Sequence, residues 1–344
     1  MPCADKNPLI REGTSLLNRV LAALSVDYAK VDERDAADII LFAKRYATCL
    51  NYYNNNNIVD GNWQALMRMD VSVTLATLAR IDTREISDYK KRLFKRIRMA
   101  GDDPTARENL RFLFDVMFSL VTLIDEQFKL LPAEFEYKAI FNDLISSKLQ
   151  YPLANLENWF EQFKSEGLLD YTANEPDNDS PIDVISNENF TRADLSTPWH
   201  DAAADIAITL PSTGTVKDKV VYVTNHNLFA AQIDSLLTGI ATIVSRANTL
   251  FVDTLENFPK HSPHYALFLA FVKLFAQEQE ALNAYTKNHL DFYYKEVLRL
   301  TNKAPIADEA HLLFELQKPV KEHRLTKNTL FKGGKDVTGK EISY

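Results

Sequence analysis

The stretch FAAQIDSLLTGIATIVSRANTLFVDTLENF, residues 229–258, carries the strongest periodic signal in the sequence. Its apolar residues recur at alternating steps of four and three, a heptad pattern typical of a helix that packs against a partner helix. The main row consists of Phe229, Ile233, Leu236, Ile240, Ile243, Ala247 and Leu250, and a neighbouring row at steps of seven consists of Leu237, Val244, Phe251 and Phe258. We therefore predict one long packing helix here.

A second long helix is predicted beyond the turn that contains Pro259 and Pro263, from Tyr265 to about Leu300. Together the two helices predict a long helical hairpin over residues 226–304. The apolar face of this pair is too wide for one hairpin to cover. Helices from the first part of the chain, or from another subunit, must therefore pack on it.

The first half of the chain, residues 1–168, predicts an all-helical block. Leu16, Val20 and Leu24 lie on one face of an amphipathic N-terminal helix. A second helix ends in the asparagine-rich stretch 51–57, because asparagine side chains compete for backbone hydrogen bonds. Further helices are predicted at about 63–81, from Thr83, over 104–128, and after Pro132 and Pro152.

Residues 169–225 have a different composition. The stretch 174–205 holds eight acidic residues against one arginine, and prolines at 176, 181, 198 and 211 interrupt any helix. We expect an irregular, exposed acidic excursion, with a short strand at Val220–Val223. Beyond Pro305, short β-like runs predict that residues 305–344 begin a β-rich domain.

The composition excludes several classes of protein. The chain has 344 residues, a net charge of -8, 46% apolar residues, nine glycines and two cysteines. Scarce glycine argues against nucleotide-binding folds, which need it at tight turns. Two cysteines provide neither a disulfide framework nor a zinc site. Since no secretory signal and no long apolar run is recognisable, we expect a protein made in the cytoplasm, without membrane insertion.

No motif for catalysis, metal binding or cofactor binding is complete. His261 and His264 straddle a turn and lack the further ligands that zinc requires. Asp177, Asp179 and Glu188 fall at positions one, three and twelve of an EF-hand-like loop, but a proline and an isoleucine replace the third ligand and the turn glycine. We therefore expect no catalytic residue, no metal and no cofactor. A helical metal-dependent enzyme is kept as an alternative.

A basic run, KKR at 90–92, KR at 95–96 and Arg98, allows two interpretations. Nucleic-acid binding would require phosphate contacts supported by aromatic stacking, and few aromatic residues are interleaved. A solvated helix face, or a contact with an acidic neighbour such as the stretch 174–205 of another subunit, explains the charges better. We therefore predict no nucleic-acid partner.

Two stretches near the ends of the chain resemble a known family. The first includes GTS (13–15), LSVDYAKVDER (24–34), FAKRYA (42–47), NYYN (51–54) and GNW (61–63). The second includes HLDFYY (289–294), AD (307–308), HLLFEL (311–316), EH (322–323), TLFKGGKD (329–336) and GK (339–340). Both resemble the baseplate J-like wedge proteins of extracellular contractile injection systems. These phage-tail-like particles include antifeeding prophages and Photorhabdus virulence cassettes.

The resemblance implies a structural role without catalytic residues. Wedge proteins of this kind pair with a second, related wedge subunit through their N-terminal helices. Their copies form a ring around the central spike and hub, hold the sheath extended and transmit the signal to contract. The implied partners are the second wedge subunit, further copies of this chain, the spike or hub, and sheath-proximal baseplate proteins. Such a particle is assembled in the bacterial cytoplasm and released. Since family members are longer, we expect this chain to end inside its first β-rich domain.

The predicted architecture is a mainly α, elongated helical bundle. It comprises a helical block (1–168), an acidic excursion (169–225), a helical hairpin (226–304) and the start of a β-rich domain (305–344). The expected partner-interface residues are Leu16, Val20, Leu24, Ile233, Leu236, Ile240, Ile243 and Phe251. Polar substitution of two adjacent positions is expected to prevent wedge assembly. The partner wedge paralogue of the same baseplate is an alternative identity, because both kinds share the N-terminal pattern.

Overall fold

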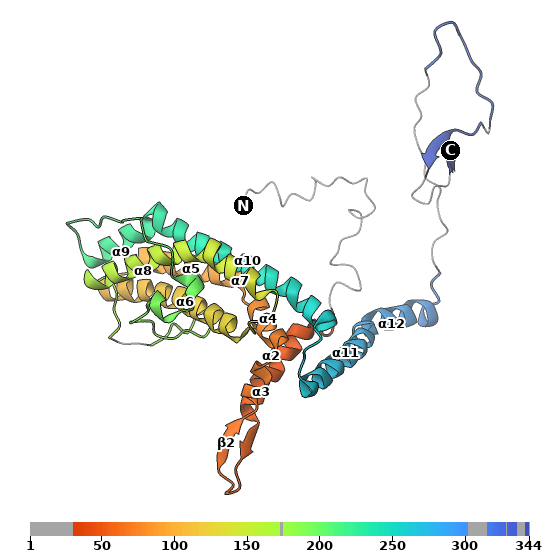
Figure 1. Ribbon diagram of the computed structural model, residues 1–344. Coiled ribbons are helices and arrows are strands. Elements are labelled where there is room, and N and C mark those ends of the chain that lie inside the picture. Colours follow the sequence, from red (N-terminus) through yellow and green to blue (C-terminus); the bar gives the residue numbers. More distant parts are fainter. Residues whose placement is uncertain (1–29, 173–174, 302–314, 328, 336–340, 344) are drawn as a thin grey trace. The chain divides into compact units, whose positions relative to one another are not determined.

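The computed structural model describes residues 30–172, 175–301, 315–327, 329–335 and 341–343. Its contacts divide the chain into two compact units: Tyr28–Asn283, and a second unit formed by Met1–Asp27 and Ala284–Tyr344. Most of the described residues lie in helices and few lie in strands (Figure 1). The predicted mainly α fold is confirmed.

The larger unit, Tyr28–Asn283, is built from helices of very different lengths. These are α2 (Ala36–Tyr46), α3 (Gln64–Arg68), α4 (Val71–Ala79), α5 (Thr83–Met99), α6 (Asp103–Leu130), α7 (Lys138–Leu144), α8 (Gln150–Ser165), α9 (Val216–Asn225), α10 (Asn227–Asn257) and α11 (Pro263–Asn283). Single 3-10 turns lie at Ala47–Cys49, Arg192–Asp194 and Thr197–Trp199, and a π-helical turn at Ile145–Leu149.

Aspartate side chains set where several helices begin. Asp82 accepts hydrogen bonds from the backbone N–H groups of Arg84 and Glu85, both at 3.0 Å, so α5 starts where the sequence predicts. Asp70 accepts from the N–H of Ser72 at 2.9 Å and starts α4 in the same way. The prediction of one helix over 63–81 was therefore wrong, because this cap divides the stretch into α3 and α4.

The asparagine-rich stretch after α2 forms a β-hairpin that the sequence analysis did not predict. Strands β1 (Asn51–Tyr53) and β2 (Val59–Asn62) pair antiparallel (Figure 1). Asn54 Oδ1 accepts hydrogen bonds from the N–H groups of Asn56 (2.9 Å) and Ile58 (3.1 Å). Asn57 has a φ of 57°, a conformation that asparagine tolerates better than most residues. Because α2 ends at Tyr46, before this stretch, the asparagine side chains close the hairpin turn, and the prediction that they stop the helix was wrong.

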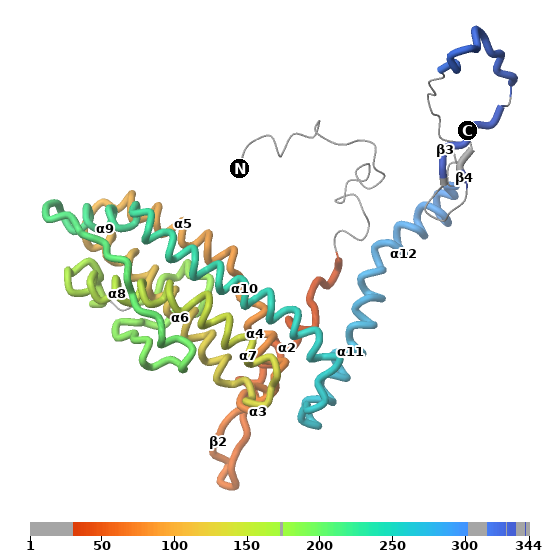
Figure 2. The backbone as a smooth tube through the Cα atoms, turned by 45° about the horizontal axis from the view of Figure 1, so that its top comes forward, coloured from red at the N-terminus to blue at the C-terminus, as the bar shows by residue number. Residues whose placement is uncertain are grey.

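Helix α10 is the central element of the core. It packs along α4 and contacts α8 and the π-helical turn at Ile145–Leu149, whereas α11 contacts α2 (Figure 2). A Cβ atom at Gly239 would collide with the side chain of Leu149, so glycine permits the closest approach between α10 and that turn. Among the described residues, α10 is also the one helix whose length and hydropathy would suffice to cross a membrane. Core helices share these properties, and here the apolar face of α10 packs inside the unit.

The predicted strand at Val220–Val223 is wrong, since these residues lie in α9. A reciprocal capping box starts this helix: Thr215 Oγ1 accepts from the N–H of Asp218 at 3.2 Å, and the Asp218 carboxylate accepts from the N–H of Thr215 at 2.9 Å. Val220 and Val223 are fully buried on the face that contacts the neighbouring helices. The cap and helical packing outweigh the β propensity of the valines.

The acidic segment, residues 175–210, is irregular but is not the exposed excursion that was expected. Apart from two single 3-10 turns it has no helix or strand, yet Trp199 is fully buried and Ile208 nearly so. The Trp199 indole N–H donates to Asp125 Oδ1 of α6 at 3.0 Å. The backbone carbonyl oxygens of Ile206 and Ile208 accept from Trp159 (3.0 Å) and Gln162 (3.1 Å) of α8. The segment therefore binds along the helices as part of the core.

We expect Trp199→Ala to destabilise the larger unit by about 3–5 kcal/mol, because it leaves a cavity and removes a donor from a buried carboxylate. Chemical denaturation would measure this loss. Ile185→Ala in the same segment is the matched control, since Ile185 is exposed and its loss should cost less than about 0.5 kcal/mol. Equal effects of the two substitutions would contradict the buried role of the segment.

The smaller unit is described only in part. It contains α12 (Tyr285–Asp291), a π-helical turn at Phe292–Val297, and the antiparallel strands β3 (Lys332–Lys335) and β4 (Glu341–Ser343). The single helix predicted from Tyr265 to about Leu300 is thus observed as α11, α12 and the π-helical turn. The stretch HLLFEL at 311–316, one of the β-like runs expected beyond Pro305, lies largely outside the described residues.

Candidate assembly site

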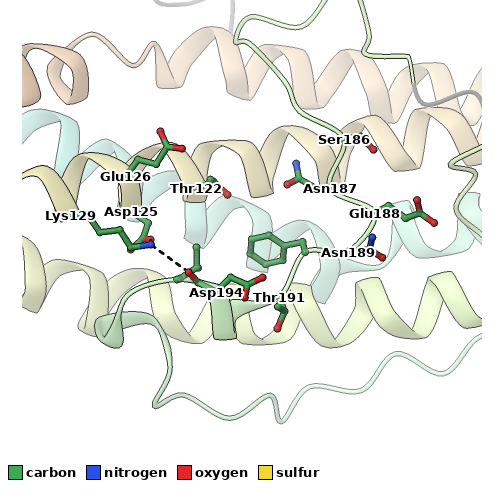
Figure 3. A pocket seen from close by; sticks show the side chains of 12 residues that line it. Thr122, Asp125, Glu126, Lys129, Ser186, Asn187, Glu188, Asn189, Thr191 and Asp194 are labelled. Atoms are coloured by element: carbon green, nitrogen blue, oxygen red, sulfur yellow. Dashed lines mark hydrogen bonds and ion pairs between the residues drawn. The ribbon is translucent and has the colours of Figure 1, made fainter. Parts of the chain in front are cut away.

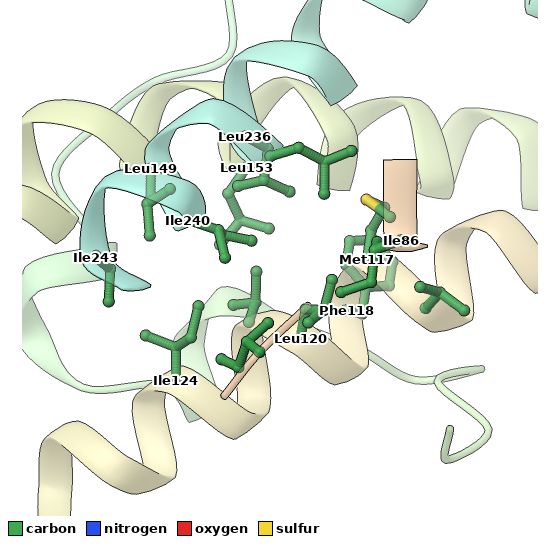
Figure 4. Packing of buried hydrophobic residues seen from close by; sticks show 14 of the residues in the cluster. Ile86, Met117, Phe118, Leu120, Ile124, Leu149, Leu153, Leu236, Ile240 and Ile243 are labelled. Atoms are coloured by element: carbon green, nitrogen blue, oxygen red, sulfur yellow. The ribbon is translucent and has the colours of Figure 1, made fainter. Parts of the chain in front are cut away.

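The predicted interface positions on α10 belong to the core of the chain itself. Ile233, Leu236, Ile240 and Ile243 are fully buried, and Phe251 is nearly so. Figure 4 shows Leu236, Ile240 and Ile243 facing residues of the other helices, among them Leu120, Ile124 and Leu149. In this fold these side chains pack within the larger unit and are not exposed to another subunit. The other three predicted positions, Leu16, Val20 and Leu24, lie outside the described residues.

Helix α11 carries an exposed apolar face that the sequence analysis did not single out. Tyr265, Leu269 and Val272, spaced by four and three residues, are buried. A second row has the same spacing and is exposed: Leu267 is 75% exposed, Phe271 57% and Leu274 64%. We call this second row the α11 apolar face. The signal was present in the sequence: residues 265–275 are apolar apart from Lys273, and a helix that is apolar all round needs partners on both sides.

The position of α11 within the larger unit is set at both of its ends. Near its start, the Tyr265 hydroxyl lies 2.9 Å from Ser72 Oγ in α4. Near its end, Asn283 accepts from the N–H of Asp32 through Oδ1 and donates to the Asp32 carbonyl through Nδ2, both at 2.9 Å. Such reciprocal side-chain to backbone pairs fix both position and register. The apolar face is therefore presented by an anchored helix.

The β1–β2 hairpin provides a second exposed apolar surface on the larger unit. Tyr53 and Ile58 of the hairpin, and Trp63 and Met69 at the two ends of the adjoining α3, are each about half exposed or more. A cavity of about 340 Å³ lies at the base of the hairpin, and its lining includes Tyr52, Trp63 and Met69. Aromatic residues and methionine are enriched at protein interfaces relative to other surfaces. This composition suits contact with another protein.

The basic helix α5 is largely paired within the chain. Arg96 contacts Asp177 (2.6 Å) and Asp179 of the acidic segment. The Tyr89 hydroxyl donates to Asp177 at 2.7 Å. Burial alone would raise the pKa of Asp177, but the hydrogen bonds from Tyr89 and Arg96 hold it below the usual value. The acidic residues that pair with Arg96 and Tyr89 of α5 thus belong to the acidic segment of the same chain, and not to that of another subunit.

Three further basic residues of α5 also have carboxylate partners. Lys90 pairs with Asp234, Lys91 with Asp88 at 2.7 Å, and Arg92 with Glu85 at 2.9 Å. In the EF-hand-like stretch, Asp177 and Asp179 are directed to Arg96, and Asp177 also accepts from Tyr89. Within the described ranges, no group of three or more His, Cys, Asp or Glu side chains is arranged to hold a metal ion.

A polar groove of about 510 Å³ lies between α6 and the acidic segment (Figure 3). Asp125, almost fully buried, accepts from the N–H of Ser196 at 3.1 Å and pairs with Lys129 at 2.7 Å. A second buried carboxylate further along α6, Asp115, accepts from the N–H of Asn187 at 3.0 Å, and burial raises its pKa to about 6. Both carboxylates are used to hold the acidic segment on α6.

One family model matches the chain, over residues 250–344, and it is described as baseplate protein PVC11-like. This part of the chain is similar to a baseplate protein. The baseplate-like part begins in α10 and contains all of α11, including the α11 apolar face. The match supports a structural role in the baseplate of a contractile injection system. No curated protein matches the chain.

Proposed function

We propose that this protein is a wedge subunit of a contractile injection system baseplate. In this role it assembles around the central spike and hub and couples baseplate rearrangement to sheath contraction. The observation that carries the proposal is the α11 apolar face, which lies within the baseplate-like part and has the spacing that a partner helix needs. The resemblance of two further stretches to baseplate J-like wedge proteins supports the same role.

The proposed partners are proteins, and no cofactor is part of the proposal. A second wedge subunit would supply a helix for the α11 apolar face, and further copies, the spike or hub and sheath-proximal proteins would complete the baseplate. The particle would be assembled in the bacterial cytoplasm and then released. The alternative is that the protein is the partner wedge paralogue of the same baseplate. Either identity requires assembly through helices.

Removal of the gene from the producing cells tests the proposal. We expect negative-stain images to show no particles, or polymerised tube and sheath without a baseplate. The control is the same strain complemented with the intact gene, which should restore contractile particles. Normal particles in the absence of the protein would contradict a role in the wedge.

A further inference from the structure

The exposed apolar side chains of the larger unit are concentrated around the β1–β2 hairpin. Nine large apolar side chains between residues 42 and 69 are exposed, against seven in the much longer described stretch between residues 70 and 262. Figure 1 shows the hairpin projecting from α3, away from the other helices of this unit. Exposed apolar residues that occur singly are ordinary, whereas a concentrated group marks a surface that another molecule covers. We call the exposed apolar residues within 42–69 the hairpin surface.

Three cations flank the hairpin surface. Lys44 and Arg45 lie in the last turn of α2, shortly before the hairpin, and Arg68 is the last residue of α3, shortly after it. Among the described residues, no carboxylate lies within ion-pair distance of any of the three. Asp60, the one carboxylate between residues 42 and 69, is exposed in β2. The larger unit thus leaves these three charges to solvent or to a partner.

The three cations are close enough to repel one another. Burial, followed by the charges of Arg68 and Arg45, lowers the pKa of Lys44 to about 8, and only Glu126 of α6 opposes this shift. Lys44 Nζ donates to Thr77 Oγ1 of α4 at 2.9 Å, which holds the ammonium group in place. An anion bound beside these cations would relieve their repulsion.

The cavity at the base of the hairpin indicates what the partner must carry. Its volume is about 340 Å³, and Asn62 is the one lining residue that is neither apolar nor aromatic. Met69 lines the cavity and directly follows Arg68, so the apolar cavity and the cations share one surface. Side chains that fill such pockets contribute most of the binding energy at protein interfaces. A partner that fits therefore combines an apolar side chain with neighbouring carboxylates.

Two other occupants fit these observations less well. Nucleic acids stack their bases on exposed aromatic rings, but Phe42 and Tyr46 of this surface already stack on each other, with 6.2 Å between ring centroids. A symmetric contact with a second copy of the chain would bring the same three cations face to face, and like charges oppose association. The observations therefore favour a different protein as the partner.

We propose that the hairpin surface and its three cations form the docking site for an acidic segment of a different protein. An apolar side chain of that segment fills the cavity, and carboxylates on either side of it pair with Arg45 and Arg68. This pairing also offsets the repulsion that the two arginines exert on Lys44. The inference does not depend on the proposed role in the baseplate, because any protein with such a segment satisfies it.

Photocrosslinking in the producing cells tests the occupant. The variant Met69→p-benzoylphenylalanine places the reactive group at the cavity, on a side chain that is 75% exposed. We expect a crosslink to one protein, and mass spectrometry of the crosslinked peptide should show at least two Asp or Glu residues beside the attachment point. A crosslink to nucleic acid, to lipid, to a second copy of this chain or to a segment without carboxylates would overturn the proposal, as would no crosslink at all.

Charge reversal tests the role of the cations. Arg45→Glu combined with Arg68→Glu should lower the crosslink yield about tenfold, because attraction becomes repulsion. Both arginines are exposed, so circular dichroism should show an unchanged fold. Lys95→Glu combined with Arg98→Glu on α5 is the matched control, since it makes the same change in net charge at exposed positions and should leave the yield unchanged. Replacing the carboxylates of the partner segment with lysine should restore the crosslink of the Arg45 and Arg68 variant. An unchanged yield in that variant, or no restoration, would overturn the pairing.

Discussion

Replacing both Leu267 and Leu274 with aspartate is expected to abolish baseplate assembly while the larger unit stays folded. Both side chains lie on the α11 apolar face and are mostly exposed, so the change removes little buried area within the chain. At an interface, two such anchors contribute roughly 2 kcal/mol each. Their loss corresponds to on the order of a thousandfold weaker association. Negative-stain imaging of particles and circular dichroism of the purified chain would measure the two effects.

Lys273→Asp combined with Gln277→Asp is the matched control for this experiment. Both residues are exposed on the same helix, and neither belongs to the α11 apolar face. The control changes the charge of α11 without removing apolar side chains, so particles should assemble normally. Contractile particles formed by the Leu267 and Leu274 double variant would show that this face has no role in assembly.

Ile240→Asp is expected to destabilise the larger unit by more than about 4 kcal/mol, because it places an unpaired carboxylate in the core. Ile240 is fully buried where α10 passes the π-helical turn and α8 (Figure 4). Native proteins have a total stability of only about 5–15 kcal/mol, so much of the protein should be unfolded or aggregated. The free energy of unfolding from urea denaturation is the relevant measurement.

Ser245→Asp provides the control, since Ser245 lies on the exposed side of the same helix. We expect it to change the free energy of unfolding by less than about 0.5 kcal/mol. A folded, stable Ile240→Asp protein would contradict the central position of α10. The result also bears on the expectation that polar substitution of two adjacent predicted interface positions prevents wedge assembly. For Ile240 and Ile243, a loss of particles would follow from unfolding and not from a lost interface.

The sequence predicted helix starts well where a local cap sets them, and poorly where distant packing decides. The start of α5 follows from Asp82 and the residues directly after it. The helical state of Val220–Val223 depends on burial against neighbouring helices, which no local pattern of valines reveals. The burial of Trp199 depends on Asp125, which lies 74 residues earlier in the chain. An acidic, proline-rich composition therefore indicates irregular backbone, but it does not reveal that single side chains such as Trp199 are buried.

At the candidate site, too, the local sequence predicted the helix, whereas distant packing decided which of its residues are buried. Heptad spacing identified α10 as a packing helix, but spacing alone does not say whether the partner is the same chain or another one. The tertiary structure decided this by placing α4, α8 and the π-helical turn against α10. It left Leu267, Phe271 and Leu274 of α11 exposed.

The sequence by itself determined that this protein is mainly helical, because periodicity and capping act over a few residues. Only the tertiary structure decided which apolar face is buried and which is exposed. The physical reason is that burial depends on residues far apart in the chain meeting in space. The residues that meet in this way include those that anchor the two ends of α11.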